Sequence, residues 1–322
     1  MIWSRILGTG AYLPERVVHN TELEGVMETS DSWIRERTGI VSRHYAAEGE
    51  TTVDMAEHAA RRAIEAAGIT AADIDLIVFA TATPDLVFPN CGVMLQARLG
   101  CRGGPAFSVE AACSGFIYAL SIADKFVRSG EARHALVVGS ETLTRITDFD
   151  DRTTAILFAD GAGAVVLGAS PQAGVLSTHL HSDGSYQDLL YCTGGVSRGY
   201  EAGTGNRALI RMAGREVFKV AVTMLGNVVD EVLAAHDLRK GDIKWLVPHQ
   251  ANIRIIQAVA KKLDMSLDNV IVTVQEHGNT SAASVPLALD TGIRDGRIKP
   301  GDLVLLEAFG GGFTWGAALV RM

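Results

Sequence analysis

The feature that most constrains the fold of this chain is an internal repeat. Three segments of the first half resemble three segments of the second half, and they occur in the same order. Two of the pairs combine a helical pattern, a polar turn and an apolar run of strand length, and the third is a glycine-containing strand. Three matches in one order indicate a duplicated unit. The pairs are residues 66–81 with 234–250, 119–141 with 286–308, and 161–168 with 311–320.

Helical patterns alternate with continuous apolar runs in both halves. This alternation is typical of parallel β-sheets that helices cover on both faces, so the chain is predicted to have an α/β fold. We place the boundary near Ser170–Pro171, which gives a first half of residues 1–170 and a second half of residues 171–322. A chain of 322 residues is long enough to bury a core in each half.

Composition narrows the possible functions. The net charge of -8 argues against nucleic-acid binding, because neutralising phosphates requires clustered Lys and Arg. No stretch approaches the roughly 18 apolar residues of a membrane span. The N-terminal segment lacks the charged and apolar regions of a signal peptide, so we expect a cytoplasmic location. The four cysteines include no CxxC pair, and so we expect neither a metal site nor a disulfide framework.

Cys113 is the strongest candidate nucleophile. A strand-like run, residues 106–109, precedes it, and apolar residues at helical spacing follow it. A cysteine at the start of a helix faces unpaired N–H groups and the positive end of the helix dipole, which favour the thiolate. Its small neighbours leave room for a substrate. A buried structural cysteine is the alternative, and this is how we interpret Cys91, Cys101 and Cys192.

The repeat connects Cys113 with Asn279. Each lies 17 residues before a glycine that ends the next predicted helix, Gly130 in the first half and Gly296 in the second. The two residues are therefore expected to occupy equivalent positions at helix N-termini, and a pseudo-twofold axis would bring those helix ends to one pocket. The alternative role for Asn279 is a simple helix cap.

His249 is the candidate third member of the site. It follows the apolar run 245–247, and ligands bind at the C-terminal ends of strands in open α/β sheets. A structural histidine is the alternative, and His277, beside Asn279, is the competitor for the role of base. The glycine run 310–312 lets backbone N–H groups approach a ligand closely, as an oxyanion site requires.

At these residues the chain resembles the β-ketoacyl-acyl-carrier-protein synthase III family, whose members start fatty-acid synthesis. The resemblance implies a duplicated five-layer α/β/α/β/α fold of the thiolase-like type, and a homodimer. It rests on motifs that follow one another along the whole chain: GTGAYLPERVVHN, TSDSWIRERTGI, ACSGFIYAL, DRTTAILFADGAGAVVL, VPHQANIRII, HGNTSAASVPLAL and LLEAFGGGFTWGAALVRM.

The resemblance implies a catalytic triad of Cys113, His249 and Asn279. In the implied reaction, the Cys113 thiolate takes the acyl group of a short-chain acyl-CoA primer, with acetyl-CoA the expected one. The backbone N–H groups of Cys113 and Gly311 would form the oxyanion hole. Malonyl-acyl-carrier protein would then lose carbon dioxide, and its enolate would attack the acyl group. No metal or redox cofactor is implied, since coenzyme A enters as a thioester substrate.

The resemblance also assigns binding residues. A stacking ring and arginines suit the adenine and phosphates of coenzyme A, and a cationic patch would hold an acidic carrier protein. Phe88 matches a loop that reaches the partner subunit's acyl pocket, and Phe309 is also assigned to an acyl pocket. The alternatives are a core tryptophan and solvated cations. The implied CoA contacts are Trp33, Arg37, Arg152, Phe218, Ala251 and Asn252, and the implied carrier-protein contacts are Lys219, Arg254, Lys261 and Lys262.

Some details leave other functions open. Ser114 stands where alanine is common in the family, and residues 196–207 lie where members differ, so the primer is not specified. Thiolase-fold enzymes of secondary metabolism, which make alkylquinolone precursors or join fatty-acyl groups head to head, keep the same triad. Papain-like thiol hydrolases share the order Cys, His, Asn, but ACSGF lacks their tryptophan signature. An intact triad argues against a catalytically silent scaffold.

Overall fold

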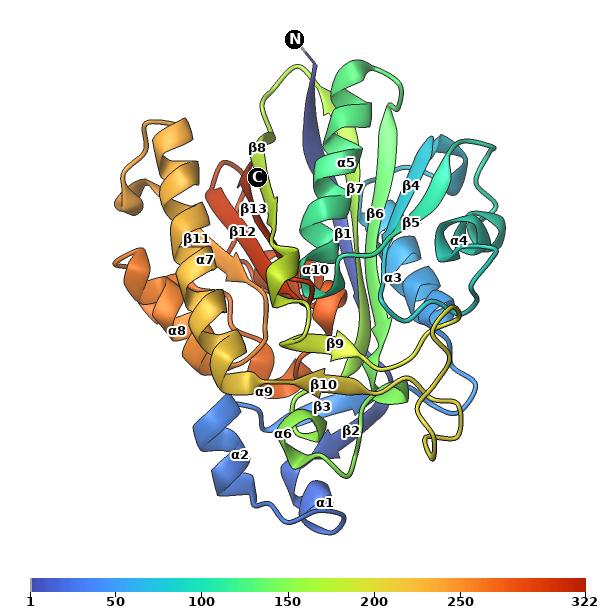
Figure 1. The fold of residues 1–322 in the computed structure, drawn as a ribbon. Helices are drawn as coiled ribbons and strands as arrows, with labels where there is room; N and C mark the ends of the chain where they lie inside the picture. Colours follow the sequence, from blue (N-terminus) through green and yellow to red (C-terminus); the bar gives the residue numbers. More distant parts are fainter. Residues whose placement is uncertain (1) are drawn as a thin grey trace.

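The computed structural model describes residues 2–322 and contains two main β-sheets with helices in three layers (Figure 1). The strand order is β1-β7-β6-β4-β5 in the first sheet and β8-β13-β12-β11 in the second. The first sheet comprises β1 (Trp3–Tyr12), β4 (Leu76–Ala80), β5 (Ala106–Val109), β6 (His134–Thr142) and β7 (Asp160–Ser170). The second comprises β8 (Val175–Ser182), β11 (Trp245–Pro248), β12 (Leu303–Gly310) and β13 (Thr314–Arg321).

Five layers follow from the helix contacts. Helices α3 (Thr52–Ala66) and α4 (Cys91–Leu99) cover the outer face of the first sheet. Helices α5 (Gly115–Ser129) and α10 (Ser284–Arg294) contact strands of both sheets and fill the space between them. Helices α7 (Gly214–Ala235) and α8 (Ile253–Lys262) lie over the second sheet, opposite α3 and α4 in Figure 1. The predicted α/β/α/β/α arrangement is confirmed.

The two sheets match strand for strand. In the first, β7 runs antiparallel to β1 and β6, while β4 runs parallel to β6 and β5. In the second, β13 runs antiparallel to β8 and β12, while β11 runs parallel to β12. A parallel bridge between Leu246 and Val270 takes the place that β5 has in the first sheet. One topology therefore occurs twice, although the boundary at residue 170 stays a prediction.

The expectation of parallel sheets holds only in part, because both sheets are mixed. Only the strands at one side of each sheet run parallel. The apolar runs misled the interpretation for a physical reason: helices cover both faces of each sheet, so its strands are buried whatever their direction. Strand β7, for example, is buried from Asp160 to Gly168 although both of its neighbours are antiparallel.

A short 3-10 turn precedes each central helix, and the two turns contact each other. They are η2 (Ala112–Ser114) before α5 and η7 (Ser281–Ala283) before α10. Each turn begins with a non-glycine residue of positive φ, +44° at Ala112 and +50° at Ser281. By this geometry Cys113 corresponds to Ala282.

The expected equivalence of Cys113 and Asn279 is therefore off by three residues. Counting back from the glycines misplaces it because the two central helices differ in length, 15 residues in α5 and 11 in α10. Asn279 instead lies two residues before η7, the turn that matches η2.

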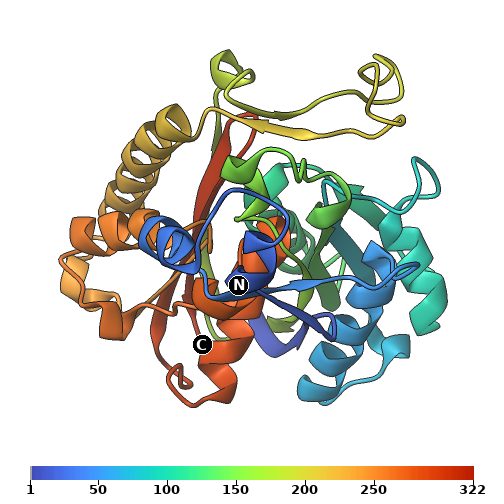
Figure 2. The ribbon, with the colours of Figure 1, turned by 90° about the horizontal axis from the view of Figure 1, so that it is seen from below.

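Smaller elements surround the ends of the central helices. A paired arm, β9 (Leu190–Cys192) with β10 (Ile210–Met212), extends along one edge of the molecule in Figure 2. The residues 193–209 that connect these strands include the predicted variable segment. The other elements are β2 (Arg16–His19), β3 (Ser42–Tyr45), α1 (Asn20–Glu24), α2 (Asp31–Thr38), α6 (Arg152–Ala155), α9 (Val274–His277) and η1 (Ala71–Asp73), η3 (Leu143–Arg145), η4 (Gly184–Tyr186), η5 (Lys240–Asp242) and η6 (Leu267–Asn269).

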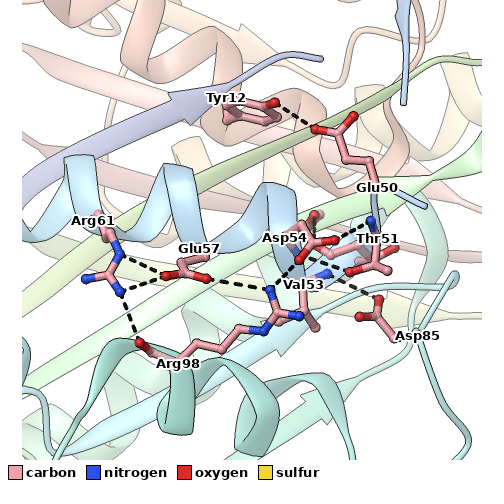
Figure 3. Close-up of polar contacts among 11 residues, drawn as sticks. Tyr12, Glu50, Thr51, Val53, Asp54, Glu57, Arg61, Asp85 and Arg98 are labelled. Carbon is pink, nitrogen blue, oxygen red and sulfur yellow. Dashed lines mark hydrogen bonds and ion pairs between the residues drawn. The ribbon is translucent and has the colours of Figure 1, made fainter. Parts of the chain in front are cut away.

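A charged network joins the two helices on the outer face of the first sheet (Figure 3). Arg98 of α4 hydrogen-bonds Asp54 of α3, and its guanidinium lies 3.6 Å from Glu57. The start of α3 also holds the loop that connects β4 to α4, because the Val53 N–H donates to Asp85 Oδ1 over 3.2 Å. The Asp85 contact attaches the middle of that loop to the helical layer.

Candidate active site

Cys113 lies between two cavities, at the point where the two halves meet. The larger cavity has a volume of about 570 Å³, and the smaller one has a volume of about 80 Å³. Cys113, Phe158 and Leu190 line both. The smaller cavity is also lined by His249 and Asn279, so the structure brings the three predicted triad residues together at one space.

The environment of the thiol differs from the expectation of a stabilised thiolate. Burial raises the pKa of Cys113 to about 12, and the negative charges of Glu141 and Glu110 raise it further, while a hydrogen bond from Ser281 opposes them. The structure also places Cys113 inside the short turn η2, ahead of the first residue of α5. Burial of the sulfur thus works against the thiolate, which the position of Cys113 just before α5 favours.

The glycine run packs against the nucleophile. A β-carbon at Gly310 would lie 2.7 Å from the Cys113 nitrogen and 3.0 Å from the Ser114 nitrogen, so only glycine fits there. Gly311 follows at the hairpin between β12 and β13 and lines the larger cavity beside Cys113. Close packing of the hairpin on the turn therefore places the backbone of both predicted oxyanion residues at the same cavity.

His249 follows directly after β11, as the sequence pattern indicates. Burial lowers its pKa to about 3, so the imidazole is neutral. Its Nδ1 lies 2.5 Å from Ser284 Oγ, and that oxygen also accepts a hydrogen bond from the Gln250 N–H over 3.3 Å. With the Ser284 hydroxyl as the donor to Nδ1, the imidazole hydrogen lies on Nε2, the tautomer that can donate to a ligand.

Asn279 is held by both its backbone and its side chain. Its N–H donates to the Leu157 carbonyl and its carbonyl accepts from the Ala159 N–H, each over 2.9 Å. Its Oδ1 accepts from the Ser281 N–H over 3.0 Å. Because this bond occupies the oxygen, the amide NH₂ is the end left for a ligand. The Asn279 oxygen thus bonds the first residue of the following turn, and Asn279 also lines the smaller cavity.

Three polar residues of the site were missed in the sequence. Ser284 hydrogen-bonds His249, and Ser281 donates a hydrogen bond to the buried Glu141. Both Ser281 and Glu141 affect the pKa of Cys113. A signal for the serines exists in HGNTSAAS, where they follow Asn279 at short spacing. Glu141 gave only a weak signal, a charge at the end of an apolar strand.

Trp33 lies close to two cations. The guanidinium carbon of Arg37 is 4.7 Å from its ring centroid and that of Arg152 is 5.1 Å from it. Arg152 also donates to the Glu28 carbonyl over 2.8 Å. Three of the predicted CoA contacts therefore form one cluster. The other three, Phe218, Ala251 and Asn252, line the smaller cavity with Cys113.

The predicted carrier-protein residues lie on α7 and α8. The Arg254 guanidinium carbon is 5.6 Å from the centroid of the Phe218 ring, which places it next to the smaller cavity. Lys262 is paired with Asp230 over 2.6 Å, so its charge is partly neutralised. Lys219 and Lys261 occupy the same two packed helices.

The two predicted acyl-pocket phenylalanines have different settings. Phe309 is buried, lines the smaller cavity and packs against Phe313 with ring centroids 4.6 Å apart. Phe88 is 83% exposed, and it lines neither cavity beside Cys113 in its own subunit. Its neighbours Leu86 and Val87 are also exposed, which makes the loop an apolar patch.

Two expectations about other residues change. Cys192, interpreted as structural, is exposed and lines the larger cavity. His277 is half-buried, with its pKa lowered to about 4, first by burial and then by the charge of His44. It does not line either of the cavities that contain Cys113, so it is not a competitor for His249.

Residues 2–322 contain no group of three or more His, Cys, Asp and Glu side chains arranged to hold a metal ion. Over the same residues, every helix is too short or too polar to cross a membrane.

Comparisons with known proteins agree with this architecture. Residues 107–184 match the family model for 3-oxoacyl-[acyl-carrier-protein] synthase III, and residues 233–322 match the model for its C-terminal part. A β-ketoacyl-[acyl-carrier-protein] synthase III of Thioalkalivibrio sulfidiphilus is 60% identical over 100% of both chains. The crystal structure of the synthase III of Aquifex aeolicus superposes with a TM-score of 0.92, at 46% identity over 99% of this chain and 100% of that one.

More distant structures share the fold. A priming β-ketosynthase of a polyketide pathway is 39% identical over 99% of this chain and 96% of its own, with a TM-score of 0.93. The duplicated sheets, together with a cysteine on the turn between them, define a condensing enzyme of the thiolase-like fold. Within that class, the chain belongs to the β-ketoacyl-acyl-carrier-protein synthase III family.

Proposed function

We propose that this enzyme joins an acyl-CoA primer to malonyl-acyl-carrier protein in two half-reactions that share Cys113. The observation that carries the proposal is the smaller cavity, where Cys113 of the first half meets His249 and Asn279 of the second. In the first half-reaction the Cys113 sulfur attacks the thioester carbonyl and coenzyme A leaves. The backbone N–H groups of Cys113 and Gly311 stabilise the oxyanion that forms.

In the second half-reaction malonyl-acyl-carrier protein loses carbon dioxide. Nε2–H of His249 and the amide of Asn279 donate hydrogen bonds to the thioester oxygen, where negative charge gathers in the enolate. Burial lowers the pKa of His249 to about 3, so the imidazole is neutral and donates through the single N–H of its tautomer. The enolate carbon then attacks acyl-Cys113 and gives a 3-ketoacyl thioester. The reaction uses no metal or redox cofactor, because the loss of carbon dioxide drives it.

The substrates reach Cys113 from two sides. The Trp33 cluster with Arg37 and Arg152 binds the nucleotide end of coenzyme A, where Trp33 offers a stacking surface and the arginines offer charge to phosphates. The smaller cavity, lined by Phe218 and Asn252, receives the thioester arm. The larger cavity beside Cys113 accepts the acyl group. Cations of α7 and α8, with Arg254 at the cavity edge, bind the acidic carrier protein.

The enzyme works as a homodimer in the cytoplasm. The exposed apolar loop around Phe88 supports a dimer, because apolar patches of this kind are usually covered by a partner. In the dimer, Phe88 enters the acyl cavity of the other subunit and limits the length of the primer. A priming role in polyketide synthesis is the second candidate, favoured by the likeness to a priming β-ketosynthase.

Intact-protein mass spectrometry tests the function. After incubation with single acyl-CoAs, the enzyme should gain the mass of one acyl group on Cys113, and acetyl-CoA should give the strongest signal. Addition of malonyl-acyl-carrier protein should discharge the adduct with release of carbon dioxide. Cys113→Ala should form no adduct, and a wild-type chain that forms none with any primer would contradict the proposal.

A further inference from the structure

Arg43 is a fully buried arginine whose hydrogen bonds all go to uncharged groups. It lies in β3, and its Nη2 donates to Asn20 Oδ1 over 2.8 Å and to the Ile156 carbonyl over 3.0 Å. Its Nε and Nη1 have no hydrogen-bond partner among residues 2–322. Burial lowers the pKa of this guanidinium, because the charged form loses its solvation. A cation in such a setting costs free energy, so stability alone does not account for its presence.

The carbonyl that Arg43 holds lies at the start of the segment against which Asn279 is aligned. The Asn279 N–H donates to the Leu157 carbonyl, and the Ala159 N–H donates to the Asn279 carbonyl, each over 2.9 Å. The two bonds form a parallel bridge. Arg43 therefore fixes one end of the segment 156–159, and this segment sets the position of the Asn279 backbone.

A second contact joins Arg43 to the residue before Asn279. A β-carbon at Gly278 would lie 2.9 Å from the Arg43 Cβ and 3.0 Å from the Ala159 Cβ, and the φ of this glycine is +66°. Only glycine suits both the space and the backbone conformation. Strand β3 also contacts α9, the helix directly before Gly278 (Figure 1). The chain thus passes against the stem of Arg43 immediately before it reaches Asn279.

Asn20 holds the guanidinium in place. Its side chain is buried, and its Nδ2 donates to the Ile40 carbonyl over 2.7 Å and to Asp31 Oδ1 over 2.8 Å. Since both amide hydrogens are used in this way, the oxygen of Asn20 is directed at Arg43. Asp31 is the first residue of α2, so the arginine is braced against a helix on one side while it holds the segment 156–159 on the other.

We propose that Arg43 is a positioning residue that holds the Asn279 amide at the smaller cavity for the enolate step. The inference rests on the proposed function, in which this amide donates to the thioester oxygen. Arg43 lines neither of the cavities beside Cys113, so it acts through the Ile156 carbonyl and Gly278. A donor displaced by about 1 Å can lower a rate by about 10²-fold. Decarboxylation depends on Arg43 for this reason, and acylation, which does not use Asn279, is independent of it.

Arg43→Met separates this role from a purely structural one. The substitution loses two hydrogen bonds, but it also removes an unpaired buried charge and fills the space with a flexible apolar chain. The variant should therefore fold with a Tm close to that of the wild type and acylate Cys113 at the wild-type rate. Its decarboxylation of malonyl thioester, measured as release of radiolabelled carbon dioxide, should fall by about 10²-fold. An equal decline of both half-reactions would contradict the proposal.

A double-mutant cycle shows whether Arg43 acts through Asn279. Asn279→Ala should slow decarboxylation by about 10²–10³-fold. Addition of Arg43→Met should slow it little further, because the amide that the arginine positions is gone. Losses that multiply in the double variant would overturn the proposal and leave the proposed function intact. Normal decarboxylation in Asn279→Ala alone would contradict the proposed function, and the role of Arg43 would fall with it.

Ser4→Ala is the matched control. It removes another fully buried hydrogen bond, from Ser4 Oγ to Asp124 Oδ1 over 2.6 Å, while Asp124 keeps its ion pair with Lys125. Both half-reactions should keep their wild-type ratio, and a selective loss of decarboxylation here would show that general destabilisation explains the loss in Arg43→Met. Should Arg43→Met not fold, Arg43→Lys decides by the same cycle, because the shorter side chain keeps the charge and cannot reproduce both Nη2 bonds.

Discussion

Gly310 and the backbone nitrogen of Cys113 are in such close contact that a β-carbon on the glycine would lie 2.7 Å from that nitrogen. The hairpin between β12 and β13 therefore sets the position of the nucleophile's turn. The contact joins a strand of the second half to a catalytic turn of the first, and it has a direct consequence for mutagenesis.

Gly310→Ala should lose acylation while keeping the fold. The added methyl group must push η2 away from the hairpin, and a displacement of this size spoils the geometry of attack. We expect acyl-adduct formation to fall by about 10²-fold or more, as measured by mass spectrometry. Gly103→Ala is the control, because open space surrounds that glycine and its φ is ordinary. An unchanged rate in Gly310→Ala would show that the turn tolerates displacement.

His249→Ala should separate the two half-reactions. Acylation of Cys113 should continue, because the sulfur does not require the imidazole, and decarboxylation of malonyl thioester should fall by about 10²–10³-fold with the loss of one donor. Radiolabelled carbon dioxide release measures the second step. Normal decarboxylation in this variant would remove His249 from the role proposed for it.

Ser284→Ala tests the tautomer of His249. Without the hydroxyl hydrogen on Nδ1, the imidazole no longer has a fixed hydrogen on Nε2, so decarboxylation should slow by about 10-fold. The acylation rate of the same variant serves as the internal reference. A variant that lost both half-reactions equally would point instead to a general disturbance of the site.

Stability should have a maximum on the acidic side of neutrality. The pKa of His249 falls from 6.5 to about 3 on folding and that of His277 to about 4, so these residues destabilise the fold as pH drops below about 6.5. Glu141 and Glu307 rise from 4.5 to about 7 and about 8, so they stabilise the protonated fold at low pH and this contribution is lost as pH rises through those values. The opposing slopes leave a maximum between about pH 4.5 and 6.5.

Glu307→Gln checks this account of the alkaline side. The Glu307 carboxyl oxygens are buried without hydrogen-bond partners, so the charged form is costly above about pH 8 and a neutral amide avoids that cost. The difference in Tm between the variant and the wild type should be several degrees more favourable at pH 8.5 than at pH 5.5. Scanning calorimetry at both values measures the difference. An equal shift at the two values would mean that the ionisation of Glu307 does not govern the decline.

Phe88→Ala should lengthen the acyl chains that the enzyme accepts. Removal of the ring from the partner's cavity opens space there, and adducts of longer acyl-CoAs should then form on Cys113. Val87→Ala is the control, because Val87 is a similarly exposed neighbour, 72% accessible. Mass spectrometry over a series of acyl-CoAs gives the chain-length limit of each variant. Identical limits in both would contradict the role of Phe88.

Much of the architecture could be predicted from the sequence, because an internal repeat indicates that both halves have the same order of helices and strands. The strand before Cys113 occupies the predicted residues 106–109, and His249 follows its strand as predicted. Strand direction could not be read, since burial on both faces removes the alternation that distinguishes the two kinds of sheet.

The site was harder to predict where it depends on contacts across the fold. Asn279 was aligned with Cys113 by counting residues, but a shorter α10 shifts the match to Ala282. Glu141 and Ser281 are 140 positions apart, and their contact exists only after the two halves pack. The raised pKa of Cys113 is likewise a property of burial, which the small residues around it did not indicate.

The matching turns have a consequence for how such a site can evolve. In a symmetric dimer each substitution is made twice, so a change that creates a nucleophile in one copy also creates it in the other. When both copies lie on a single chain, each can change alone. Here one turn carries Cys113 and the other carries Ala282 at the same place, with a serine and an asparagine just before it. The turn of the first half supplies the reacting sulfur, and the matching turn of the second half supplies residues that surround it.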